Sequence, residues 1–169
     1  MVTMRAGIAL GSNLGNRLAN LSAARARLSE LPKIEPSILA SAVYETEPID
    51  CEPTATRFFN AVMEFGYDGE PAELLRGLRG IEAALGRSPR HARNVSRTLD
   101  LDLLYFGDLT LSAPELELPH PRMHTRQFVL EPLAEIRPEL VLPAQQKTVA
   151  DLLEELPDRS PLVRVTSQW

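Results

Sequence analysis

Apolar residues recur at the spacing of a helix face in two stretches of the chain. The first stretch ends at Pro32, and its apolar members are Leu18, Leu21, Ala24, Leu28 and Leu31. The second begins at Pro71, a residue favoured in the first turn of a helix, and its apolar members are Leu74, Leu78, Ile81 and Leu85. The pattern predicts two amphipathic helices, each with one face toward a common core.

Strand-like runs surround these two helices. The runs cover residues 5–10, 38–45, 58–67 and 98–106. In the last run apolar residues alternate with polar ones, and we expect the core face to carry Leu99, Leu101, Leu103 and Tyr105. The order β-α-β-β-α-β is typical of an α+β fold, the ferredoxin-like split βαβ sandwich, in which both helices pack on one face of an antiparallel sheet.

The chain after Leu109 is a proline-rich C-terminal extension, with short helices expected over 127–134 and 149–156. A length of 169 residues is that of one domain, so we expect residues 1–169 to form a single domain. No apolar run approaches the roughly 18 residues needed to span a bilayer. Residues 6–10 are too short for a signal peptide, so we expect a cytoplasmic protein without membrane contact.

The charge of the chain is unevenly distributed. A net charge of −5 argues against a general nucleic-acid binder. Residues 83–99, however, contain no acid, and their basic side chains are Arg87, Arg90, His91, Arg93 and Arg97. Guanidinium groups suit bidentate phosphate contacts. An RNA-binding loop is the alternative, but such loops interleave aromatic residues with the cations, and residues 86–97 contain none.

Two aspartates in the run 98–106 form the first candidate site. Asp100 and Asp102 are two residues apart, so they project from the same face of a strand, about 6 to 7 Å apart at Cα. Paired carboxylates are hard oxygen ligands that suit Mg²⁺, which completes its shell with water and substrate phosphate. The alternative is a solvated outer face of the sheet. Metal beside arginines is the combination that polyphosphate transfer requires.

Three further segments bear on this chemistry. Glu82 lies at the edge of the second helical stripe and should face the sheet, unless it is a surface side chain on the helix flank. His120 stands between two prolines, and with Arg126 it is a candidate phosphate contact. The glycine spacing of residues 11–15 fits neither a dinucleotide loop nor a Walker sequence, which excludes a P-loop kinase.

Seven segments in this order resemble the 6-hydroxymethyl-7,8-dihydropterin pyrophosphokinase family of folate biosynthesis. They span nearly the whole chain. The first four segments are residues 8–15 (IALGSNLG), 44–46 with Pro48, 59–62, and Ile81-Glu82 with Gly86-Arg87. The last three are residues 97–102 (RTLDLD), 119–123 (PHPRM) and 126–133 (RxFVLxPL, in which positions 127 and 131 are not part of the motif). The resemblance implies transfer of pyrophosphate from ATP to the hydroxymethyl group of a reduced pterin, with release of AMP.

The resemblance also implies roles for particular residues. Two Mg²⁺ ions would be bound by Asp100 and Asp102, which are also catalytic together with Arg87 and Arg97. The ATP contacts would be Glu82, Arg87, Arg97, His120 and Arg126. The pterin contacts would be Thr46, Phe58, Asn60 and Phe128, with the two phenylalanines on either side of the ring. The expected partners are ATP and a reduced pterin only, and the expected state is a monomer.

The residues alone leave two other functions open. Another two-metal phosphoryl or nucleotidyl transferase could use paired aspartates on the same fold. The chain could instead be a small-ligand regulatory module that catalyses no reaction. Asp100 and Asp102 would then be merely solvated. Release of AMP from ATP that depends on a pterin separates these possibilities.

Overall fold

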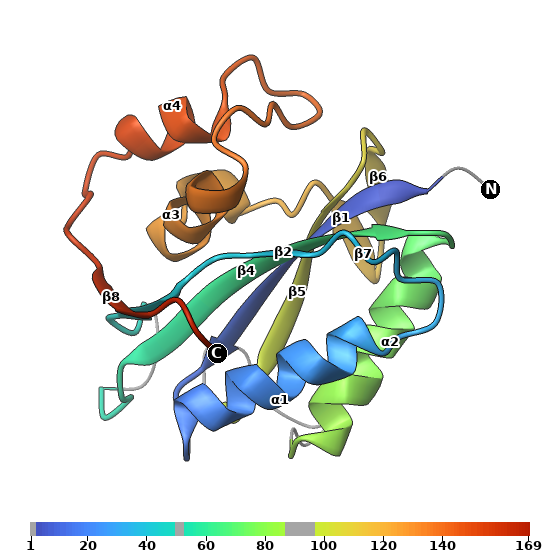
Figure 1. Cartoon of the computed structure of the whole chain (residues 1–169). Helices are drawn as coiled ribbons and strands as arrows, with labels where there is room; N and C mark the ends of the chain where they lie inside the picture. Colours follow the sequence, from blue (N-terminus) through green and yellow to red (C-terminus); the bar gives the residue numbers. More distant parts are fainter. Residues whose placement is uncertain (1–2, 50–52, 87–96) are drawn as a thin grey trace.

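The computed structural model describes residues 3–49, 53–86 and 97–169. An antiparallel sheet forms its centre, with strand order β5-β1-β4-β3-β8 and with β2 paired to β4 (Figure 1). The strands are β1 (Met4–Ser12), β2 (Leu39–Ala40), β3 (Val43–Thr46), β4 (Phe58–Tyr67), β5 (Asp100–Phe106) and β8 (Val163–Thr166). Strand β1 pairs with both β4 and β5, so it aligns the strands that carry Phe58, Asn60, Asp100 and Asp102.

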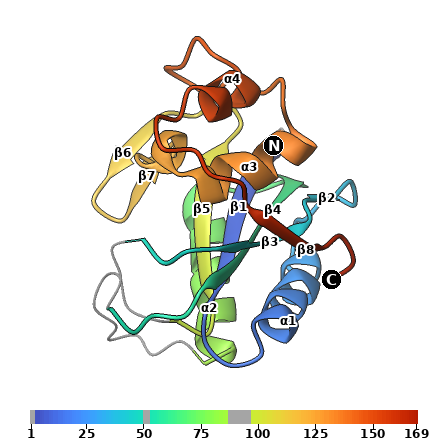
Figure 2. The ribbon, with the colours of Figure 1, turned by 90° about the vertical axis from the view of Figure 1, so that its left-hand side faces the viewer.

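Helices cover both faces of this sheet. The two predicted amphipathic helices are α1 (Arg17–Ser29) and α2 (Pro71–Ala84), and their buried leucines pack on one face. The opposite face is covered by α3 (Gln127–Ile136) and α4 (Val149–Glu154), which lie apart from α1 and α2 in Figure 2. The α+β class, the antiparallel sheet and the two helical stripes are therefore confirmed. Within the described ranges, no helix has the length and apolarity to cross a membrane.

The expected strand over 38–45 is interrupted at Ser41. Its hydroxyl accepts a hydrogen bond from the Val62 N–H at 2.9 Å, and its own N–H donates to the Val62 carbonyl at 2.9 Å. A side-chain oxygen thus occupies the place of a backbone acceptor, and the run divides into β2 and β3. The single strand predicted from apolar spacing was wrong at this point, because spacing does not report side-chain bonds to the backbone.

Tyr105 does not share the face of the three leucines, and the prediction for it was wrong. Gly7 pairs with Tyr105 but Ile8 pairs with Leu103, so Leu104 is an extra residue in β5. This β-bulge shifts the alternation by one position. Leu103 stays in the core under α1 and α2, whereas Tyr105 is buried on the opposite face. There its hydroxyl donates a hydrogen bond to the buried Glu64 carboxylate.

The C-terminal extension contains more structure than the sequence predicts. The two expected helices are present as α3 and α4. A short 3-10 turn (Met123–Thr125) precedes α3, and β6 (Leu111–Ala113) pairs with β7 (Leu116–Leu118) as a separate hairpin. Strand β8 joins the main sheet beside β3. These strands were missed because they are three or four residues long and mostly exposed, so they carry little apolar periodicity.

Gly7 is the position where the bulge leaves no room for a side chain. A Cβ atom there would lie 2.3 Å from the Tyr105 ring, which is fixed by its bond to Glu64. We expect Gly7→Ala to lower the free energy of unfolding by about 1–3 kcal/mol, the range for overpacked cores. Urea unfolding followed by circular dichroism measures this.

The matched control is Gly80→Ala on the exposed face of α2. Nothing lies within 4 Å of a Cβ at Gly80, and alanine is the better helix former by about 1 kcal/mol. This variant should be as stable as the parent protein or more stable. Equal stabilities for the two variants would contradict the described packing of Tyr105 against β1.

Candidate active site

A cavity of about 570 Å³ opens at the end of the sheet where β1 and β3 finish and β4 and β5 begin. Its other wall is the segment from His120 to Phe128, which leads into α3. Nine of the residues singled out from the sequence line this one cavity: Thr46, Phe58, Asn60, Arg97, Asp100, Asp102, His120, Arg126 and Phe128. Segments far apart in the sequence therefore meet in a single site.

Asp100 and Asp102 form the acidic wall of the cavity, on the face that the alternation predicts. The Arg97 guanidinium contacts Asp100 at 2.8 Å between Nη1 and Oδ1. Burial, and after it the charge of Asp100, raise the pKa of the Asp102 carboxyl to about 7 against the opposing effect of Arg126. Burial next to a like charge makes the ionised form of Asp102 costly, so this wall favours a bound cation.

Arg97 also has a buried donor with no partner among the described residues. Its Nε is buried and has no hydrogen-bond partner within the part of the chain that is described. Buried guanidinium N–H groups are normally satisfied, so this donor is suited to an anionic ligand in the cavity.

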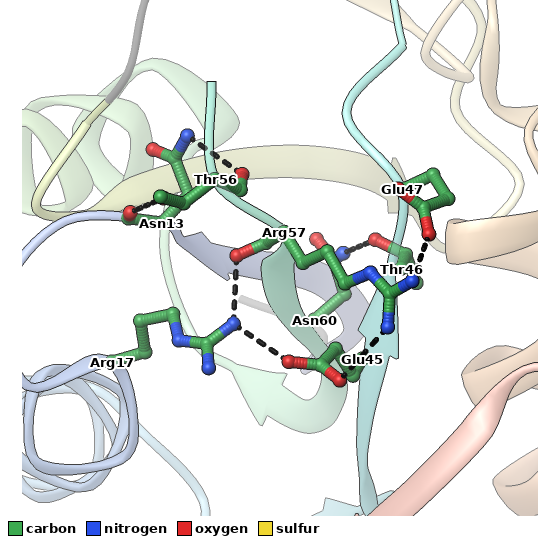
Figure 3. Close-up of polar contacts among 8 residues, drawn as sticks. All are labelled: Asn13, Arg17, Glu45, Thr46, Glu47, Thr56, Arg57 and Asn60. Atoms are coloured by element: carbon green, nitrogen blue, oxygen red, sulfur yellow. Dashed lines mark hydrogen bonds and ion pairs between the residues drawn. The ribbon is translucent and has the colours of Figure 1, made fainter. Parts of the chain in front are cut away.

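The opposite end of the cavity is built from β3 and β4. Asn60 and Thr46 are buried, and the Asn60 side-chain amide donates to the Thr46 hydroxyl at 2.6 Å (Figure 3). Phe58, at the start of β4, lines the cavity beside them, and Phe128 lines it from the segment that leads into α3. A buried polar pair in a cavity that aromatic side chains also line is typical of a site for a flat, hydrogen-bonding heterocycle.

Gly11 separates the two ends. It pairs with Asp100 on one side and with Asn60 on the other, so these three residues form one row across the sheet. Neighbouring strands are about 4.8 Å apart, which places Asp100 and Asn60 roughly 10 Å apart at the backbone. A Cβ at Gly11 would lie only 3.0 Å from Asn60 Oδ1, so glycine keeps the floor of the cavity clear.

His120 is held in the cavity wall as a neutral imidazole. Its backbone N–H donates to the Leu104 carbonyl at 2.7 Å, and its Nδ1 accepts from the Arg122 N–H at 3.2 Å. Burial, and after it the nearby charges of Arg126 and Arg122, lower the pKa of His120 to about 4. With Nδ1 occupied as an acceptor, the ring proton belongs on Nε2, where it can be donated to a ligand.

Among the described site residues, Glu82 does not line the cavity. Glu82 is buried, as its position in the helical stripe predicts, and its carboxylate accepts the Leu101 N–H at 2.7 Å. It therefore anchors the strand between the two aspartates, and its expected contact with ATP stays a prediction. Arg87 lies outside the described residues, as do Arg90, His91 and Arg93.

The sequence missed Asn13, which links two segments beside the cavity. Its Oδ1 accepts the Arg97 N–H at 2.7 Å, and its Nδ2 donates to the Thr56 carbonyl at 3.2 Å (Figure 3). The residue types around Asn13 predict only a turn, although Asn13 belongs to the motif segment 8–15. Arg122, Glu47 and Ile49 also line the cavity without having been predicted.

The acidic wall has the donor chemistry of a Mg²⁺ site. Among residues 3–49, 53–86 and 97–169, no three His, Cys, Asp or Glu side chains gather as a metal site. Two carboxylates are nevertheless sufficient for Mg²⁺, which usually takes one or two from the protein and the rest from water and phosphate. The hard oxygen donors and the repulsion between Asp100 and Asp102 fit this ion.

The protonation state of His120 can be measured directly. In the ligand-free protein its imidazole should titrate near pH 4, well below the ordinary value of about 6.5. The unfolded chain binds this proton at higher pH, so His120 lowers the stability of the folded state as the pH falls from about 6.5 to 4. Nuclear magnetic resonance of labelled histidine reports the midpoint. A midpoint near 6.5, like that of an exposed histidine, would contradict a buried neutral ring.

Comparison with known proteins gives a consistent family. Residues 7–138 match the model of the 7,8-dihydro-6-hydroxymethylpterin-pyrophosphokinase (HPPK) family. The 2-amino-4-hydroxy-6-hydroxymethyldihydropteridine pyrophosphokinase of Bacillus subtilis is 43% identical over 129 residues, which cover 76% of this chain and 75% of that protein. The protein of the same name from Methylorubrum extorquens is 38% identical over 161 residues, covering 95% of this chain and 98% of its own.

Solved structures share the fold. A chain described as HPPK-DHPS in complex with substrates superposes with a TM-score of 0.73 at 14% identity, over 91% of this chain and 43% of that one. Plasmodium falciparum HPPK-DHPS with pteroate gives a TM-score of 0.71 at 15% identity, over 90% and 42%. The chain thus spans less than half of these structures. From the match over residues 7–138 and the identities to curated relatives, the chain belongs to the 7,8-dihydro-6-hydroxymethylpterin-pyrophosphokinase family.

Proposed function

We propose that this cavity is where the chain transfers pyrophosphate from ATP to the hydroxymethyl group of 6-hydroxymethyl-7,8-dihydropterin, releasing AMP in folate biosynthesis. The observation that carries the proposal is the division of one cavity into two ends. One end gathers carboxylates and arginine for a metal-bound polyphosphate. The other gathers aromatic rings and an amide for a pterin.

Asp100 and Asp102 would hold Mg²⁺, and we propose two ions, as the family resemblance implies. Bound there, the metal would neutralise phosphate charge and polarise the phosphate that is attacked. The two carboxylates contribute a negative wall that a bound cation would compensate. Asp100 is additionally held by Arg97, which fixes the orientation of one ligand oxygen.

Arg97, His120 and Arg126 would bind the phosphates of ATP. Arg97 has a buried Nε–H without a described partner, and His120 offers its Nε2–H while remaining uncharged. Arg126 lies at the start of α3, where it borders the cavity. We propose Arg87 and Glu82 as further contacts to ATP, on the family resemblance alone.

Asn60 and Thr46 would recognise the pterin edge, and Phe58 and Phe128 would stack on its ring. One N–H of the Asn60 amide is bonded to Thr46, which fixes the amide orientation, and its Oδ1 and second N–H would bond to the ligand. The pterin hydroxymethyl group would then lie toward the aspartates, across the row that Gly11 keeps open.

In the reaction the hydroxymethyl oxygen attacks the β-phosphorus of ATP and loses its proton to solvent. The bond from that phosphorus to the oxygen bridging the α-phosphate breaks, and AMP leaves with the bridging oxygen. Arg97 and Arg126 would stabilise the negative charge that moves onto AMP, because fixed guanidinium groups in a dry site need no reorganisation. The protein therefore acts by positioning and electrostatics.

Several expectations remain part of the proposal. We propose that residues 1–169 act as one pyrophosphokinase domain, as a monomer in the cytoplasm. The ferredoxin-like description of the core is supported by the strand order β5-β1-β4-β3, in which the first strand is central.

The two aspartates test the chemistry. Asp100→Asn and Asp102→Asn should each lower kcat at least about 100-fold, because an amide cannot replace a carboxylate toward a divalent cation. The assay quantifies AMP and the pterin diphosphate by chromatography, with and without pterin. Asp108→Asn, an exposed aspartate just beyond β5, is the matched control and should keep full activity.

Two outcomes would contradict the proposal. ADP in place of AMP would indicate a single phosphoryl transfer, the reaction of a different transferase. Full turnover in either aspartate variant would show that the acidic wall has no part in the chemistry.

The aromatic rings test where the pterin binds. Phe58→Ala and Phe128→Ala should each weaken pterin binding by about tenfold or more, the cost of losing a stacking platform. Nucleotide affinity should change little, because metal and arginines hold the phosphates. Calorimetry with each ligand measures both affinities. Equal losses for the two ligands would show that the aromatic end has been misassigned.

A further inference from the structure

An ion-pair network lies at the base of the pterin end of the cavity, and we name it the Arg17 network. It consists of Arg17, Glu45, Glu47 and Arg57 (Figure 3). Arg17 comes from the first turn of α1, and the other three lie where β3 ends and β4 begins. Its two cations and two anions balance, so the network is neutral as a whole.

Arg17 makes three contacts, two within this network and one with a neighbouring aromatic ring. Its Nη1 donates to Glu45 Oε1 at 2.9 Å and to the Arg57 carbonyl at 2.8 Å. Its guanidinium carbon lies 3.8 Å from the centre of the Phe59 ring. Arg17 and Glu45 are only 27% and 23% exposed, so this pair is better shielded from salt than a surface ion pair.

Arg57 extends the network across the two strands. Its Nη2 contacts Glu47 Oε1 at 2.7 Å, and its Nη1 lies 3.7 Å from Glu45 Oε2. Glu45 and Glu47 flank Thr46, and Arg57 directly precedes Phe58. The network therefore surrounds the pair Thr46 and Phe58, which are register partners and the last pair in this ladder.

Other contacts also hold this end of the sheet. Strand β8 pairs with β3 as far as Glu45. Beyond Glu45, the hydrogen bonds to the two strand ends include those of the Arg17 network, the Thr46–Asn60 hydrogen bond and the links between Thr56 and Asn13. Arg17 is the one member of the network that ties these strand ends to a helix.

We propose that Arg17 is a positioning residue that holds Thr46 and Phe58 in place for binding of the flat pterin ring. It acts through Glu45 and the Arg57 backbone, and it is absent from the residues lining the cavity. The inference rests on the proposed function, because it assumes that the pterin lies against Phe58 and Asn60. It assigns a substrate-selective role to a residue remote from Asp100 and Asp102.

The experiment compares variants of Arg17, Glu45, Arg27 and Phe128 by steady-state kinetics and calorimetry, with Glu45→Gln measured both alone and combined with Arg17→Gln. Arg17→Gln removes the charge and keeps the helix, and it should raise KM for pterin about three- to tenfold, the loss of a shielded charged pair. Its kcat and nucleotide Kd should stay within about twofold of wild type. Arg17→Lys should recover part of the loss, because an ammonium can pair with Glu45 but cannot also stack as a plane on Phe59.

Arg27→Gln is the matched control, since Arg27 is exposed on the same helix. It should leave both substrates unaffected. Glu45→Gln combined with Arg17→Gln should cost little more than Arg17→Gln alone, because both remove the same pair. Additive losses would overturn the inference, as would an Arg17→Gln variant that behaves like Arg27→Gln.

Phe128→Ala distinguishes failure of this inference from failure of the proposed function. If Phe128→Ala weakens pterin binding while Arg17→Gln does not, the cavity is correctly assigned and the positioning role is wrong. If neither variant affects pterin, the aromatic end is not the pterin site. Equal weakening of pterin and nucleotide by Arg17→Gln would indicate a general loss of structure and would also overturn the positioning role.

Discussion

The repulsion between Asp100 and Asp102 is the constraint around which this cavity is organised. Two carboxylates on one face of β5, one of them largely removed from water, favour a cation between or beside them. The strand can carry this charge because its other face packs leucines against α1 and α2. Glu82 secures the same strand from behind by accepting the Leu101 N–H. The charged wall is thus supported by a well-packed core.

The sheet places this charged wall next to a very different surface. Antiparallel pairing of β5, β1 and β4 sets Asp100, Gly11 and Asn60 in one row. Because the row is only three strands wide, a nucleotide phosphate at one end and a heterocycle at the other can meet above Gly11. Asn13, just after β1, bonds to Arg97 on the charged side and to Thr56 on the aromatic side. One strand and its following turn therefore link both halves of the site.

Alternation in a strand was sufficient to predict that Asp100 and Asp102 share a face, and helical spacing was sufficient for α1 and α2. The same reasoning failed for Tyr105, because the bulge opposite Gly7 depends on which strands pair. Ser41 was misjudged for a related reason, since its hydroxyl bonds to the backbone of a strand distant in sequence. Local pattern thus predicts elements, and it cannot predict the contacts that interrupt them.

The site residues show the same limit. Nine of them meet in the cavity, which motif resemblance anticipated and spacing alone could not. Glu82 faces the sheet as expected, yet its described partner is a backbone N–H of β5. The Arg17 network had no signal in the sequence, because its four charges come from the start of α1, the end of β3 and the residue before β4. Ion pairs of this kind depend on how α1 lies against β3 and β4, which only the assembled fold defines.

The central claim is that one cavity holds both substrates at once. Calorimetric titration with pterin of protein already saturated with Mg²⁺ and a non-hydrolysable ATP analogue tests it most directly. The account predicts binding of one pterin per chain with the nucleotide still bound, and loss of that binding in Phe128→Ala. Displacement of the nucleotide by pterin, or pterin binding that is indifferent to Phe128, would contradict it.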